Sequence, residues 1–153
     1  MLDAHLDAGH LWAMAATLIA VMLCILLHYE VSMRLWRGLE ESRSTLRRRF
    51  LKLSFVLFGA HVAEIWIFGM AMALLGEHPL AGQLVGLETV NLLDYVYFSA
   101  ITYTTLGYGD LFPTGAIRII TASESLLGFM LITWSASLTF LEMQRHWSSR
   151  RKP

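Results

Sequence analysis

The chain has 153 residues, of which 56% are apolar, and its mean hydropathy is +0.52. A soluble domain of this size keeps a largely polar surface, so the composition excludes one and indicates a single membrane domain. The formal net charge is zero, the single cysteine, Cys24, excludes an intramolecular disulfide, and no patch of basic residues indicates nucleic-acid binding.

The first predicted membrane span is Leu11 to Leu27, a run of seventeen residues without a charge. It can continue as helix to about Trp36. Residues 1–10 contain acids and histidines but no Lys or Arg. A secretory signal begins with positive charge, so we do not expect this run to be one.

A basic segment follows, with seven Lys and Arg residues from Arg34 to Lys52. Gly38 and residues 42–44 predict a break in helical structure, so we expect this segment to form a loop. Two interpretations remain open. The segment is either a solvated loop or a cytoplasmic anchor for anionic lipid headgroups, with about 1 kcal/mol for each basic residue near the surface. In the second interpretation the contacts come from the run Arg47, Arg48, Arg49.

The second predicted span is Leu51 to Leu75, about 25 residues or roughly 37 Å as a helix. His61 and Glu64 lie three residues apart on one face of it. Two ligands at that depth are weak evidence for a metal, so we predict no metal site there. The connection from 76 to 90 contains glycines, a proline and acids but no Lys or Arg.

The next predicted helix is short and runs from Leu92 to Thr104. Asn91 is a typical N-cap, and Asp94 lies where the helix dipole favours a negative charge. About 13 residues span roughly 20 Å, whereas the hydrocarbon core is about 30 Å thick. We therefore expect a re-entrant helix, which enters the membrane without crossing it.

The string from Thr104 to Asp110 reads Thr-Thr-Leu-Gly-Tyr-Gly-Asp. A dehydrated cation needs a cage of oxygens, and backbone carbonyls supply it when ordinary and left-handed conformations alternate. Glycine takes the left-handed region without steric cost, and Gly107 and Gly109 stand where the alternation needs them. The predicted ligands are the carbonyls of residues 105–108 and the Thr105 hydroxyl. The alternative is an ordinary glycine-rich turn.

The third predicted span runs from Thr114 to Glu142, opened by Pro113 and with Gly128 near its middle. Of the twelve Lys and Arg residues, seven precede the second span, four follow the third, and only Arg118 lies elsewhere. The positive-inside rule then places the C-terminus in the cytoplasm and the N-terminus and residues 76–113 outside.

From about Leu51 to Leu141 the chain resembles the tetrameric potassium-channel superfamily, whose selectivity filter reads threonine, an aliphatic residue and Gly-Tyr-Gly. The resemblance implies a homotetramer that conducts K⁺ between four copies of this filter. It makes Thr105, Leu106, Gly107, Tyr108 and Gly109 the ion-binding filter. It also assigns filter support to Thr102, Thr104 and Asp110, and it places Ser99 among the polar positions before the filter. The resemblance makes Gly128 a candidate gating hinge, and close helix packing is an equal alternative for this glycine.

The chain departs from the family pattern at several points. Leu106 replaces the usual valine or isoleucine, which affects packing behind the filter rather than the number of carbonyls. Ile101 stands where some bacterial members carry an acid. We recognise no voltage-sensor helix with regularly spaced arginines, and no nucleotide- or calcium-binding domain after the third span. The first span is absent from the simplest two-span channels.

We therefore expect an all-α membrane protein with three transmembrane helices, a re-entrant pore helix and a filter loop in each subunit of a homotetramer. Its parts are an N-terminal span and basic linker (1–50), a pore domain (51–142) and a basic tail (143–153). The expected function is K⁺ conduction across the cell membrane, without catalysis or an organic cofactor. The alternatives are a poorly selective cation channel and a non-conducting membrane assembly subunit.

Two acids lie at similar depths in the predicted spans, Glu64 about 16 Å and Glu124 roughly 14 Å from the outer ends. An ionisable group at membrane depth usually faces protein or water. We hypothesise that Glu124 braces the pore helix from behind, and that Glu64 and His61 belong to the same polar cluster. Hydroxyls of Thr102, Tyr103, Ser123 and Ser125 are the expected neighbours. The alternative is that each acid bonds a nearby group separately.

The predicted topology can be tested by cysteine labelling in a variant that lacks Cys24. A membrane-impermeant reagent applied outside should label His5→Cys but not Arg48→Cys, because only the N-terminal segment lies outside. Labelling of His5→Cys from the cytoplasmic side alone would overturn the three-span topology.

Overall fold

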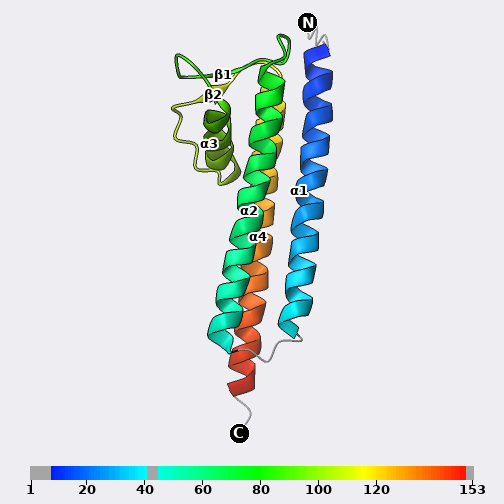
Figure 1. The fold of residues 1–153 in the computed structure, drawn as a ribbon, viewed down its shortest axis with the longest axis vertical. Coiled ribbons are helices and arrows are strands. Elements are labelled where there is room, and N and C mark those ends of the chain that lie inside the picture. The colour runs from blue at the N-terminus through cyan, green and yellow to red at the C-terminus, as the bar shows by residue number, and fades with distance from the viewer. Residues whose placement is uncertain (1–7, 41–44, 151–153) are drawn as a thin grey trace, which may run out of the picture.

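The computed structural model describes residues 8–40 and 45–150, and within them three long helices lie side by side (Figure 1). These are α1 (Ala8–Glu40), α2 (Leu46–Gly76) and α4 (Ile117–Arg150). Each is long and apolar enough to cross a membrane. A fourth, short helix, α3 (Leu92–Tyr103), lies beside one end of this bundle. The expected all-α fold is confirmed.

The N-terminus of α1 lies at the same end of the molecule as α3 and its loops, whereas the C-terminal end of α1 and the N-terminal end of α2 lie at the other end, toward the C-terminal end of α4 (Figure 1). This is the arrangement that three consecutive crossings require. Part of the topology prediction falls on residues 1–7, including His5, and these lie outside the described residues.

Small side chains allow the long helices to approach one another. Ala13, Ala20 and Cys24 of α1 are fully or almost fully buried, and they share one core with Phe68 and Met72 of α2. Many large apolar residues remain exposed on the outer faces, as expected for helices whose solvent is lipid. Packing therefore uses a narrow face of each helix.

The short helix begins as predicted. The backbone N–H of Asn91 donates to Asp94 Oδ2 at 2.8 Å, and the Leu93 N–H donates to Asn91 Oδ1 at 2.8 Å. This reciprocal pair is a capping box, which satisfies backbone donors that the first turn leaves free.

Two short strands join the loops on either side of α3. β1 (Leu84–Val85) pairs antiparallel with β2 (Phe112–Pro113), with Leu84 opposite Pro113. The prediction that Pro113 opens the third span is wrong, because it lies in β2. α4 begins at Ile117, after Gly115 with φ +62°. This strand pair fixes the loop that follows residues 104–110 to the loop that precedes α3.

The described parts of the basic segment, on either side of residues 41–44, are mostly helical, which corrects the prediction of a loop there. Residues 42–44, where a break was predicted, lie outside the described residues. α1 continues through Gly38 to Glu40, and Arg47 to Arg49 lie in the first turn of α2. Arg49 binds the carboxylate of Glu142 on α4 with two nitrogens, at 2.6 and 3.1 Å. Residues 143–150, assigned to a tail, continue α4. The prediction missed these helix ends because their sequence is polar and does not reveal how they pack.

The Arg49–Glu142 pair holds the ends of α2 and α4 together, and its carboxylate is only 3% exposed. We expect Arg49→Ala to lower the free energy of unfolding by about 1–3 kcal/mol, because a buried carboxylate loses its charged partner. Unfolding in mixed micelles measures this, with Arg48→Ala as the matched control. Equal stability of the two variants would contradict a structural role for Arg49.

Candidate functional site

The exposed loop from Thr104 to Asp110 follows α3 directly and has an alternating backbone. Its φ angles are +58° at Thr105, +53° at Gly107 and +82° at Gly109, so every second residue is left-handed. The sequence predicted this conformation for the two glycines only. A left-handed β-branched residue such as Thr105 is unusual and strained.

Hydrogen bonds to the last turn of α3 hold the start of this loop. The N–H of Thr105 donates to the Thr102 carbonyl at 2.9 Å, and the N–H groups of Leu106 and Gly107 donate to the Ile101 carbonyl at 2.9 and 3.1 Å. The Thr104 hydroxyl donates to the Ala100 carbonyl at 2.7 Å. Thr102 and Thr104, which were expected to support the filter, thus form hydrogen bonds with backbone groups at the end of α3.

The far end of the loop is held by Asp110. Its Oδ2 accepts a hydrogen bond from the Tyr97 hydroxyl on α3 at 2.9 Å. Between these anchors the side chains of Leu106 and Tyr108 are 56% and 69% exposed in the single chain. No heavy atom lies within 4 Å of a Cβ added at Gly107 or Gly109. The loop is therefore fixed at both ends and open along its length.

Two glycines bring α3 close to the long helices. A Cβ on Gly128 of α4 would lie 2.2 Å from the Tyr103 carbonyl oxygen, and one on Gly69 of α2 would lie 2.9 Å from Val96 Cα. Both contacts are with backbone, which cannot give way cheaply. Gly128 therefore has a packing role, and α4 continues through it as helix. The gating-hinge role of Gly128 stays a prediction.

Glu124 of α4 is buried behind α3 and contacts the Ser99 hydroxyl through Oε1. Ser99 also donates to the Ile65 carbonyl of α2 at 2.8 Å. A hydroxyl has one hydrogen, so a proton on Glu124 satisfies both contacts, with the carboxylic acid donating to Ser99. Glu124 thus bonds the pore helix from behind, through Ser99 rather than through the four hydroxyls that were expected. Its role as a brace stays a prediction.

A second polar network joins all four helices, and we call it the polar cluster. Its carboxylate is Glu64 of α2, which accepts a hydrogen bond from the Tyr103 hydroxyl of α3. Glu64 Oε1 lies 2.9 Å from Nδ1 of His28 on α1, and Oε2 lies 3.1 Å from Nδ1 of His61. Ser135 of α4 faces the other nitrogen of both histidines.

The polar cluster differs from the hypothesis in two ways. Glu64 and His61 are together as proposed, but among the described residues no hydrogen bond joins them to Glu124. The two networks instead hold α3 at separate points, Ser99 and Tyr103. His28 and Ser135 were missed, and the only available signal was a histidine at the end of the first apolar run.

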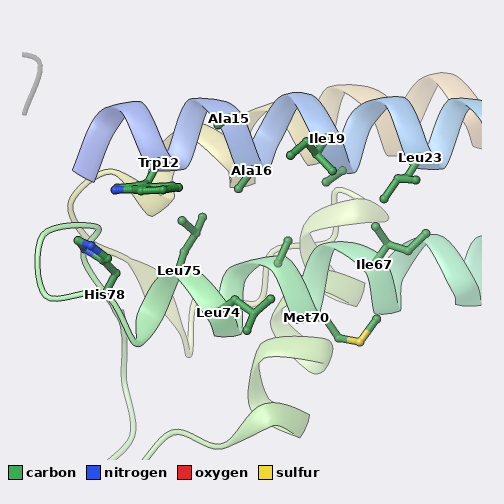
Figure 2. A pocket seen from close by; sticks show the side chains of 12 residues that line it. Trp12, Ala15, Ala16, Ile19, Leu23, Ile67, Met70, Leu74, Leu75 and His78 are labelled. Carbon is green, nitrogen blue, oxygen red and sulfur yellow. The ribbon is translucent and has the colours of Figure 1, made fainter. Parts of the chain in front are cut away.

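An apolar groove of about 550 Å³ lies between α1 and α2 near their outer ends (Figure 2). Trp12 and His78 stand at one end of it, and Leu23 and Ile67 at the other. The rest of the lining is aliphatic, so the groove offers no set of oxygen ligands for a cation.

Comparison with known proteins agrees with this geometry. A family described as "Ion channel" matches residues 60–145, which is more than half of the chain and includes α3 and the loop after it. Protein LctB of Geobacillus stearothermophilus is 25% identical over 114 residues, 72% of this chain and 85% of that protein. No solved structure matches the chain.

The Glu124 brace can be tested by two substitutions. Glu124→Gln should retain the brace, because an amide also donates to Ser99, whereas Glu124→Leu should lower stability by about 1–3 kcal/mol. Unfolding in mixed micelles measures the difference. If the leucine variant is as stable as the wild type, Glu124 is not a brace.

Proposed function

The chain belongs to the ion channel family, and on this premise we propose that it is a potassium-selective channel with four copies around one pore. The observation that carries the proposal is the alternation of left-handed residues at Thr105, Gly107 and Gly109 in an exposed loop. Such alternation lets successive carbonyls face one side, where they replace the water around a cation.

In this proposal K⁺ is the transported ion, and each subunit contributes the carbonyls of residues 105–108 and the Thr105 hydroxyl. Leu106 changes the packing behind the filter but leaves the carbonyls unchanged. The C-terminal end of α3 carries a partial negative charge, which would stabilise a cation in the pore below. No step requires covalent chemistry.

The homotetramer is supported by what a single chain leaves exposed. Non-helical backbone at membrane depth is tolerated only when protein buries it or when it lines a wet cavity. All residues from 104 to 110 are exposed here, including two large side chains. Other copies supply both the burial and the cavity, and about four carbonyls are needed around each ion.

The proposed location is the cell membrane, with the filter end outside and the C-terminus in the cytoplasm. This orientation places Arg47 and Arg48 at the cytoplasmic surface, where anionic lipid headgroups would attract them. Arg49, in contrast, binds Glu142 within the chain. It therefore contributes less than its neighbours to lipid binding.

The function is tested by reversal potentials of purified protein in planar bilayers under opposed K⁺ and Na⁺ gradients. The potential should follow the K⁺ gradient in the wild type. Gly107→Ala should abolish selective current, because a Cβ strongly disfavours φ near +53°. Gly59→Ala is the matched control, since no heavy atom lies within 4 Å of its added Cβ.

Each other outcome of this experiment favours a named alternative. Equal permeability to Na⁺ and K⁺ would reject potassium selectivity and leave a poorly selective cation channel. Absence of current from correctly assembled protein would favour a non-conducting membrane subunit.

A further inference from the structure

The polar cluster contains a set of metal-ligand atoms that the ion-conducting site does not use. One ring nitrogen of His28, one ring nitrogen of His61 and a carboxylate oxygen of Glu64 all lie within 4.8 Å of one another. The Tyr103 hydroxyl faces the same point, 2.9 Å from His61 Nδ1. His28 and Glu64 are fully buried, and the His61 side chain is 17% exposed. The three ligand residues come from α1 and α2, and Tyr103 comes from α3.

When both histidines are neutral, the hydrogen bonds of the polar cluster are one hydrogen short. A carboxylate only accepts, so each Nδ1 must carry its hydrogen to bond Glu64. Each Nε2 then has only a lone pair. Both Nε2 atoms face Ser135 Oγ, at 3.0 Å for His61 and 3.3 Å for His28. Ser135 has a single hydrogen, so one of these contacts joins two acceptors.

We propose that His28, His61 and Glu64 form a binding site for a divalent transition metal, with Zn²⁺ as the best-fitting ion. A metal takes the lone pairs of both Nδ1 atoms and moves both hydrogens to Nε2. Ser135 Oγ has two lone pairs and then accepts from both histidines. One hydroxyl thus orients two ligands, which is the usual role of a residue behind a metal-bound histidine.

The ligand types select the class of metal. Two imidazoles and one carboxylate suit Zn²⁺, Ni²⁺ or Co²⁺, whereas Mg²⁺ and Ca²⁺ require oxygen ligands. Zinc binds nitrogen and oxygen at about 2.0–2.2 Å, commonly with three protein ligands and a fourth position for water. The three ligand atoms of the polar cluster lie within 4.8 Å of one another, and the Tyr103 hydroxyl lies beside them.

A metal here would connect α1 to α2 by coordinate bonds. It would also lie next to Tyr103, the last residue of α3, whose hydroxyl donates to Glu64. The carboxylate that holds the pore helix is therefore the one that binds the metal. The site is separate from the filter loop, and its occupancy can be measured without ion conduction.

Zinc titration of the purified full-length protein in lipid nanodiscs, in competition with a chromophoric chelator, tests the proposal. The wild type should bind one Zn²⁺ per chain. His28→Ala and His61→Ala should each weaken binding at least about 100-fold, since each removes a ligand. Ser135→Ala keeps every ligand and should weaken it about 10- to 100-fold. His78→Ala, which removes a histidine outside the cluster, should bind like the wild type.

A second readout places the metal. The Trp134 ring lies 5.4 Å from the His28 ring, so bound Co²⁺ should quench its fluorescence, and Trp134→Phe should remove that part of the quenching. If His28→Ala misfolds, the binding measurement uses His28→Gln and Ser135→Ala instead. Helicity and elution volume check that these variants are folded. Absence of Zn²⁺ binding, or binding that these variants do not weaken, would overturn the proposal.

Discussion

The structure depends on holding a helix that is too short to cross the membrane. α3 has twelve residues, so its C-terminal end stops at membrane depth and the loop after it must begin there. Lipid cannot satisfy that backbone. Gly69 and Gly128 bring the backbone of α3 against the long helices, and Ser99 and Tyr103 bond buried acids on α4 and α2. Each contact fixes where the loop begins.

α1 stands outside the residues that match the ion channel family, yet it reaches the same region. Its small buried residues let it lie against α2, and His28 joins the polar cluster that ends at Tyr103. The added span is therefore connected to the end of the pore helix through one carboxylate. A change in the packing of α1 around His28 therefore alters the surroundings of Glu64.

Local patterns were sufficient to predict the three spans, the capped re-entrant helix and the glycine alternation, because each depends on neighbouring residues. What the sequence did not reveal depends on distant ones. Ser135 and His28 are 107 positions apart, and Arg49 and Glu142 are 93 apart. The pairing of Leu84 with Pro113 is too short to leave an alternating pattern. Glu124 was predicted as a brace because burial of an acid demands a partner, but nothing local identified Ser99.

Thr105 has a strained backbone, and the hydrogen-bond networks behind the loop hold it in that conformation. A threonine at φ +58° is less stable than one in an ordinary conformation, so other contacts must hold it there. Three loop N–H groups bond the last carbonyls of α3, which fixes the loop only if α3 itself cannot turn or slide.

Apolar packing alone allows small shifts of α3, because dispersion contacts have little directional preference. The hydrogen bonds that Ser99 and Tyr103 form with these acids are directional and lie four residues apart on one helical face, so together they oppose both rotation and translation of α3. This explains why two acids are buried at membrane depth, where burial is costly, directly behind the helix that the loop depends on.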